Sequence, residues 1–299
     1  MPYPLSVEEE LKKNPQIKPS DIQILMEWCE KQQHLPRISV EFLILALHSN
    51  YYSTEAAKTT IENFFTARTH IVEFFSNRDP LGSKELRQAF NTAHVSQLPV
   101  LSKEGYNIIL ASLVDCDPAH YVFDDITKYY FMVTDLICAK NGTRDGYIVI
   151  INEYNAVLAH VLKVNPMSLK KMLFYVQEAI PVRLKAVHLI NTAAIMDVAL
   201  NMMRPFMNKE TADLLHLHTS VKTLEKYVSV DLLPNEFGGK AGPESKLHEE
   251  QIKEIDNKRE WFLEEEKHLR VDESLRIGKS VNARDLFGMD GTFKKIEID

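Results

Sequence analysis

The sequence lacks the features that mark several large classes of protein. Among 299 residues it has three cysteines, Cys29, Cys116 and Cys138, and no C-x-x-C pair, which argues against a disulfide framework and fits a reducing compartment. No apolar run approaches the ~20 residues of a membrane span, and no secretory signal is recognisable at the N-terminus. The net charge is −7, so no general attraction to nucleic acid is expected. We therefore expect a cytoplasmic protein that does not bind nucleic acid.

Motifs of catalysis and cofactor binding are also missing. There is no G-x-G-x-x-G, G-x-x-x-x-G-K-[ST], G-x-S-x-G or H-E-x-x-H. His216 and His218 share one face of a strand but lack an evident third metal ligand. The segment Asp115-Cys-Asp-Pro118 is best explained as a turn that ends a strand, and His188 as a hydrogen-bonded core histidine. We expect no enzyme, no cofactor and no metal.

The first part of the chain predicts helices only. Ser20, Ser39 and Ser53 each precede an apolar stripe at helical spacing, as helix N-caps do. These residues suggest a helical N-terminal bundle over 1–92. Pro80-Leu-Gly-Ser83 and the polar stretch 91–98 indicate a boundary near residues 80–100.

The middle of the chain alternates strands and helices. Residues 107–114, 147–151 and 186–191 are apolar runs that predict strands, and a further strand is expected over 214–219. Helices are expected over 123–139 and 167–179. This order is that of βαβ units, which implies α/β architecture with a mainly parallel sheet over 93–242.

Residues 192–207 form an unusual apolar segment, Thr-Ala-Ala-Ile-Met-Asp-Val-Ala-Leu-Asn-Met-Met-Arg-Pro-Phe-Met. A helix ended by Pro205 is expected. Directly after a strand it should lie at the periphery, where core, a partner, a membrane or an apolar ligand must cover it. Six of the ten methionines fall between Met167 and Met207, and composition alone favours ordinary core filling.

From residue 243 to 299 the chain is charged. We expect one solvated helix through Arg270, then an extended tail anchored by Leu286, Phe287 and Phe293.

Several segments in order resemble the CRAL-TRIO lipid-binding family. They are Ile180-Pro-Val-Arg-Leu-Lys-Ala-Val-His-Leu-Ile-Asn191, Met203-Arg-Pro-Phe206, Leu215-His-Leu-His218 and Leu233-Pro-Asn-Glu-Phe-Gly-Gly239. The tail resembles the branch that holds the tocopherol and retinaldehyde carriers and the clavesins. The resemblance implies a sheet that floors a hydrophobic pocket, and a mobile lid helix at 192–207. It implies binding and transfer of a tocopherol, retinoid, carotenoid or phospholipid.

Strand alternation and helix spacing then suggest which side chains line the pocket. They are Tyr130, Phe131, Thr134, Ile137, Tyr147, Val149, Ile151, Tyr175, Val187, Leu189, Ile195, Val198, Ala199 and Met202. The hydroxyls of Tyr130, Thr134, Tyr147 and Tyr175 are candidate partners for a polar group of the ligand.

Arg183, Lys185, Arg204 and Lys209 are either ordinary surface charges or a rim that meets anionic lipid headgroups, at ~1 kcal/mol for each charge. The first two match a basic phosphatidylinositol bisphosphate-binding cluster of the family. Glu210 and Leu214 stand where the tocopherol carrier is basic, so the resemblance does not predict phosphoinositide-driven exchange.

We expect a monomer that holds a hydrophobic small molecule and touches membranes transiently. The alternatives are a phosphoinositide- or partner-binding regulatory module without ligand transport and, ranked last, an enzyme acting on an apolar substrate.

Overall fold

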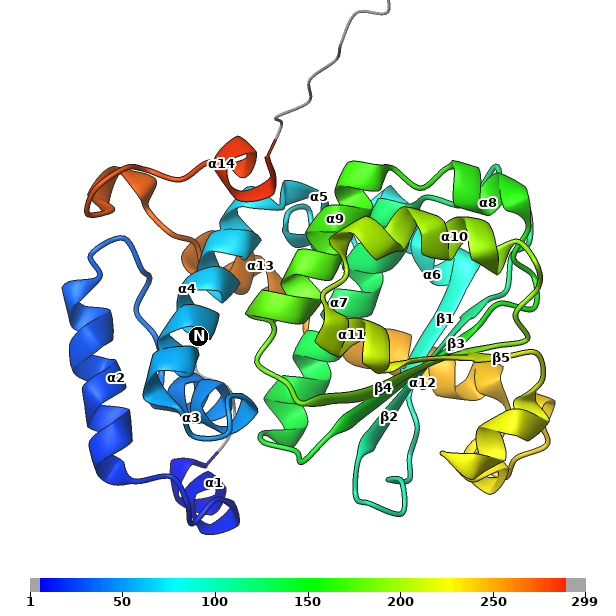
Figure 1. Cartoon of the computed structure of the whole chain (residues 1–299), viewed down its shortest axis with the longest axis horizontal. Helices are drawn as coiled ribbons and strands as arrows, with labels where there is room; N and C mark the ends of the chain where they lie inside the picture. The colour runs from blue at the N-terminus through cyan, green and yellow to red at the C-terminus, as the bar shows by residue number, and fades with distance from the viewer. Residues whose placement is uncertain (1–5, 289–299) are drawn as a thin grey trace, which may run out of the picture.

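A bundle of helices precedes the sheet in the structure, a computed structural model that describes residues 6–288. Ser39, Ser53 and Ser83 each accept a hydrogen bond from a backbone N–H in the first turn of the next helix. Ser20 is not a cap, because α2 already begins at Pro19. The helices are α1 (Val7–Lys13), α2 (Pro19–Lys31), α3 (Val40–Ser49), α4 (Thr54–His70), α5 (Val72–Phe75) and α6 (Lys84–Thr92) (Figure 1).

One five-stranded sheet forms the centre of the following domain. Its strands are β1 (Ala93–Gln97), β2 (Asn107–Leu113), β3 (Tyr147–Asn152), β4 (Leu184–Ile190) and β5 (Leu215–His218), in that spatial order. β1 pairs antiparallel with β2, and the other pairs are parallel. The predicted α/β fold with a mainly parallel sheet is confirmed.

The polar stretch 91–98 is strand β1 and not a linker. Ala93 and Val95 are buried in the core, and polar residues stand between and after them. Because three of the five residues are polar, the sequence did not predict a strand here. The strand pairs with β2 in the register Val95↔Ala111.

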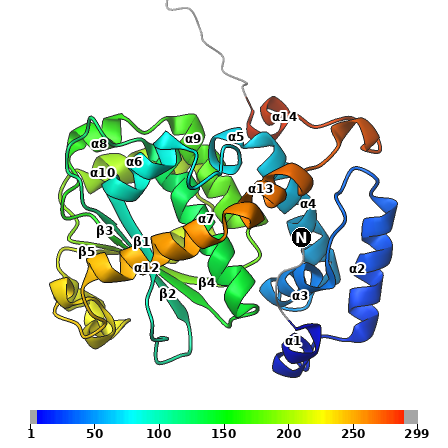
Figure 2. The same cartoon turned by 180° about the vertical axis from the view of Figure 1, so that it is seen from behind.

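Helices cover the two faces of the sheet unequally. On the side seen in Figure 1 lie α7 (Phe123–Asn141), α8 (Leu158–Leu162), α9 (Pro166–Phe174), α10 (Met196–Met203) and α11 (Lys209–Asp213). A single π-helical turn, Tyr175–Ala179, continues α9. On the opposite side, residues 221–237 form short 3₁₀ turns, and α12 (Glu244–Asn257) packs across β1, in front of the sheet in Figure 2.

Alternate residues of each strand face these two layers. Ile109, Val149 and Val187 stand side by side in register and face α7, α9 and α10, whereas Leu110 and Ile150 face the opposite core with Leu224 and Val228. One face of β3 therefore lies toward α7, α9 and α10 and the other packs into the opposite core, although both faces are apolar.

A buried ionic cluster joins three parts of the chain. Arg68 of α4 and Arg78 both pair with Asp135 of α7 and with Glu265 of α13 (Arg259–His268). The Arg68 Nη1–Glu265 Oε1 and Arg78 Nη1–Glu265 Oε2 distances are 3.0 and 2.7 Å. Both guanidinium groups are buried. Such a cluster is stable only while every charge keeps its partners.

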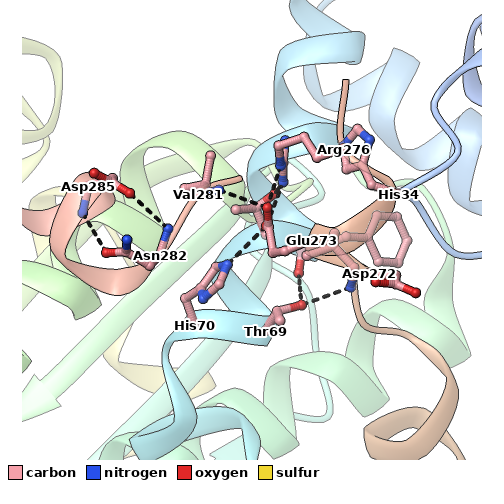
Figure 3. Close-up of polar contacts among 12 residues, drawn as sticks. His34, Thr69, His70, Asp272, Glu273, Arg276, Val281, Asn282 and Asp285 are labelled. Atoms are coloured by element: carbon pink, nitrogen blue, oxygen red, sulfur yellow. Dashed lines mark hydrogen bonds and ion pairs between the residues drawn. The ribbon is translucent and has the colours of Figure 1, made fainter. Parts of the chain in front are cut away.

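The charged C-terminal region is two helices, α12 and α13, separated at Lys258, and not one. The chain then runs back over the N-terminal bundle (Figure 3). There Glu273 accepts hydrogen bonds from Arg276 Nε at 2.7 Å and from the backbone N–H of Val281 at 2.8 Å.

The end of this segment packs against α9. In α14 (Ala283–Phe287), Phe287 is buried against Phe174, at 5.3 Å between ring centroids. Phe287 is thus an anchor, as predicted for the tail. Phe293 lies outside the described residues.

Candidate functional site

An apolar cavity of about 370 Å³ lies between the sheet and its helical cover. Its size is within the range of small-molecule pockets, roughly 300–1,000 Å³. Residues of all five strands form its floor, while α7, α9 and α10 supply its sides and top. The central lining residues are Val95, Ile109, Ala111, Tyr147, Val149, Ile151, Val187, Leu189 and Leu215 from the sheet, and Tyr130, Phe131, Thr134, Leu169, Met172, Leu173, Val176, Ile195, Ala199, Met202 and Met203 from the helices.

Eleven of the fourteen residues proposed from the sequence line this cavity. They are Tyr130, Phe131, Thr134, Tyr147, Val149, Ile151, Val187, Leu189, Ile195, Ala199 and Met202. The sheet residues are placed by the two-residue period of β3 and β4, and those of α10 by the three- and four-residue spacing of its inner stripe.

Tyr175 does not line the cavity. Its hydroxyl accepts hydrogen bonds from Arg68 Nε at 3.2 Å and Nη2 at 2.8 Å, so the ring belongs to the buried ionic cluster. Burial raises the pKa of Tyr175, which keeps the phenol neutral. The sequence could not show this, because the partner of Tyr175 is 107 residues away.

Ile137 and Val198 are the other two corrections. Ile137 lies one turn beyond Thr134 and is buried in the adjoining core with Leu136 and Cys138, where it does not line the cavity. Val198 is 40% exposed on the outer side of α10, because only Ile195, Ala199 and their neighbours on the inner stripe face the cavity.

Both ends of the apolar segment 192–207 are attached to the domain. Before it, Asn191 has a φ of 56° and donates its side-chain amide to Asn152 Oδ1 at 2.9 Å. After it, Gln177 donates to the Phe206 carbonyl at 3.0 Å and accepts from the Asn208 N–H at 2.7 Å. The α-helix is shorter than expected, since it starts at Met196 and gives way to a 3₁₀ turn at Arg204 before Pro205. It covers the cavity, and its movement as a lid stays a prediction.

The four predicted rim cations differ in their surroundings. The guanidinium of Arg183 lies 4.3 Å from the ring centre of Tyr51 and donates to the His48 carbonyl at 2.8 Å. Lys185 donates to the hydroxyl of Tyr51 at 3.2 Å. Arg204 and Lys209 are exposed. The first two are therefore engaged within the protein.

The polar residues proposed as ligand partners are also largely occupied. The hydroxyl of Thr134 donates to the Tyr130 carbonyl at 2.9 Å, and that of Tyr147 lies 3.9 Å from Cys138 Sγ. The sequence did not point to several further polar residues that line the cavity, among them Tyr121, Glu153 and His160. Glu153 could have been proposed as a site residue, because it is a charged residue directly after a buried strand.

No metal site is formed by the residues that the structure describes: nowhere in 6–288 do three His, Cys, Asp or Glu side chains gather in a suitable group. His188 and His218 instead contact each other, with 3.0 Å between Nδ1 and Nε2, on the sheet face away from the cavity. Over the same range, no helix has the length and hydropathy to span a membrane.

The comparisons with known proteins agree with this architecture. A family model described as the CRAL/TRIO domain matches residues 97–239, and one described as a Pinta-like UBA domain matches residues 14–85. Residues 97–239 therefore form a domain of the CRAL-TRIO family, whose members bind and transfer small lipophilic ligands.

Individual relatives have low sequence identity to this chain but align over most of its length. A protein named alpha-tocopherol transfer protein-like from Mus musculus is 25% identical over 238 residues, which cover 78% of this chain and 68% of the relative. Clavesin-2 from Rattus norvegicus is 21% identical over 241 residues, which cover 78% and 72% of the two chains. A solved structure, the crystal structure of Sfh5, aligns over 81% of this chain and 90% of that one with 11% identity and a TM-score of 0.44.

Proposed function

We propose that this protein binds one small hydrophobic molecule in its apolar cavity and transfers it between membranes without chemical change. The observation that carries the proposal is the cavity itself, built in a CRAL/TRIO domain from the inner faces of the sheet, α7, α9 and α10. Burial of apolar ligand surface there is favourable by roughly 25 cal/mol for each Å² removed from water. Tocopherols, retinoids, carotenoids and phospholipids are the candidate ligands.

Exposed apolar side chains beside the cavity support contact with a membrane. Tyr154, Val157, Leu158 and Leu162 are exposed on α8 and the loop before it, while Ala156, His160 and Val161 of the same segment line the cavity. A continuous segment thus presents one side to the ligand and the other to solvent. Grouped exposed apolar residues commonly mark a surface that binds a membrane or a partner.

Phosphoinositide binding is not part of this proposal. Arg183 and Lys185 are held by Tyr51, and Arg183 lies 3.6 Å from the carboxylate of Asp145. A headgroup would have to displace these contacts.

Leu162→Asp tests the membrane step. Leu162 is 70% exposed, so the change should alter the free energy of unfolding by less than about 0.5 kcal/mol. Losing the insertion of one leucine should slow transfer by about tenfold. The measurement is transfer of tritiated α-tocopherol, retinol or phosphatidylcholine from donor to acceptor phosphatidylcholine vesicles, with equilibrium binding measured separately.

Leu81→Asp is the matched control, because Leu81 is also exposed but does not line the cavity or belong to α8. It should leave the transfer rate unchanged. Equal rates for both variants would contradict a membrane role for α8. No uptake of any of the three lipids by the unmodified protein would overturn the proposed carriage of these lipids.

A further inference from the structure

One part of the cavity lining is polar. Glu153 follows β3, at the carboxyl end of the parallel strands, where ligands of open α/β sheets commonly bind. Its backbone N–H donates to the Ile190 carbonyl at 3.0 Å, and its own carbonyl accepts from the Ala156 N–H at 3.0 Å. The residue is therefore fixed where strands β3 and β4 end. Its side chain lines the cavity.

The carboxyl of Glu153 has no compensating partner. Among residues 6–288, no side chain or backbone group forms a hydrogen bond or ion pair with it, and burial raises its pKa to about 7. Glu153 is half-buried, and a polar group that is largely withdrawn from water without a hydrogen bond in the protein is costly, by up to roughly 1–3 kcal/mol. Such a group persists in proteins where a ligand or water completes it.

His160 supplies an independent observation. It is 3% exposed and lines the same cavity. Its Nδ1 accepts a hydrogen bond from the Val157 N–H at 3.0 Å, so in the neutral ring the proton is on Nε2. That Nε2 is buried and has no hydrogen-bond partner within the described part of the chain. The cavity thus contains a hydrogen-bond donor without an acceptor, His160 Nε2–H, and an acceptor without a donor, the Glu153 carboxylate.

Tyr121 connects the two groups. Its ring lies 5.1 Å from that of His160 in an edge-on arrangement. Burial raises the pKa of Tyr121, and the charge of Glu153 raises it further. Tyr121 follows β2, and Glu153 and His160 follow β3, so all three lie beyond the carboxyl ends of two neighbouring parallel strands. They therefore form a polar end of a cavity whose lining is mainly apolar.

We propose that this polar end binds the hydroxyl group of a lipophilic alcohol or phenol, with the oxygen accepting from His160 Nε2–H and the O–H donating to Glu153. A hydroxyl both donates and accepts, so it satisfies both groups. A protonated amine has no lone pair for His160, and an ether or hydrocarbon leaves the Glu153 carboxylate without a donor. The inference rests on the proposed carrier function and names the ligand class for it.

A matched pair of probes tests the inference: tritiated hexadecan-1-ol and tritiated 1-methoxyhexadecane, offered from phosphatidylcholine vesicles. At about pH 9, well above the pKa of about 7 that burial gives Glu153, the carboxylate can only accept. Because the ether cannot donate, the unmodified protein should then bind the alcohol at least about tenfold more tightly. In Glu153→Leu this preference should fall to within about twofold, with ether binding unchanged or stronger. Glu153→Gln keeps an acceptor and should retain part of the preference.

Met172→Leu is the control, since Met172 also lines the cavity but is apolar, and it should leave the alcohol-to-ether ratio unchanged. Glu153→Leu removes an uncompensated buried carboxyl, so its Tm should not fall, and this measurement shows that the variant is folded. Equal binding of the two probes by the unmodified protein, or a preference that survives Glu153→Leu, would overturn the inference and leave the carrier function standing. Binding of neither probe would count against the carrier function as well.

Discussion

Replacing Glu265 with alanine is expected to lower the free energy of unfolding by ~3–5 kcal/mol, a large part of the ~5–15 kcal/mol typical of a folded domain. The variant would leave Arg68 and Arg78, both buried, with Asp135 as their shared carboxylate, and would remove a partner of Arg270. The charge left uncompensated in the interior is the physical cause. Urea unfolding followed by circular dichroism measures the effect.

The same residue predicts a response to acid. Burial by itself raises the pKa of Glu265, but the charges of Arg68, Arg78 and Arg270 outweigh it and lower the pKa to about 2. The folded value is below the unfolded one of about 4.3, so this stabilisation is complete above about pH 4.3 and is lost as the pH falls toward 2. Stability of Glu265→Ala should therefore depend less steeply on pH across this interval.

Glu264→Ala is the matched control, on the same helix. Glu264 is half exposed and pairs with His268 at the surface, so its loss should change the free energy of unfolding by less than about 0.5 kcal/mol. A loss below 1 kcal/mol for Glu265→Ala, or an unchanged acid profile, would contradict this account of the cluster.

Val149→Trp is expected to reduce bound ligand at least tenfold while the protein stays folded. Val149 is at the centre of β3, between Ile109 and Val187 on the floor of the cavity. An indole placed there enters open space, so the overpacking that usually accompanies a larger core residue should be small. Uptake of labelled lipid from vesicles and the Tm are measured on the same preparation.

Ile150→Trp gives the opposite expectation from the next residue of the same strand. Ile150 is completely buried in the core on the other face, where extra volume costs about 1–3 kcal/mol. The folded fraction of this variant should still bind ligand. If Val149→Trp instead destabilised the protein and kept its ligand, the space above β3 would be ordinary packed core.

The main elements of the fold could be predicted because each carries a local signal. The strands at 147–151 and 186–191 are continuous apolar runs, and α3 and α4 begin at serine caps. β1 was missed because its five residues are mostly polar. The division at residues 92 and 242 stays a prediction, while the ionic cluster and the returning C-terminal segment join these parts through side chains that no local pattern connects.

The candidate site was predictable where it follows a period and not where it depends on distant contacts. Alternation placed Val149, Ile151, Val187 and Leu189 on the cavity floor. The position of the Tyr175 side chain, in contrast, depends on its hydrogen bond with Arg68, which is far away in the sequence. Glu153 and His160 lie in the loop and short helix after β3, where neither period applies, so only the three-dimensional structure brings them to the same cavity.

The central claim, that the cavity carries a hydrophobic ligand, is tested most directly by mass spectrometry of an organic-solvent extract of the purified protein. The account predicts about one hydrophobic compound for each chain, and its loss from Val149→Trp but not from Ile150→Trp. An empty extract, together with no uptake from vesicles that contain tocopherol, retinoids, carotenoids or phospholipids, would contradict it.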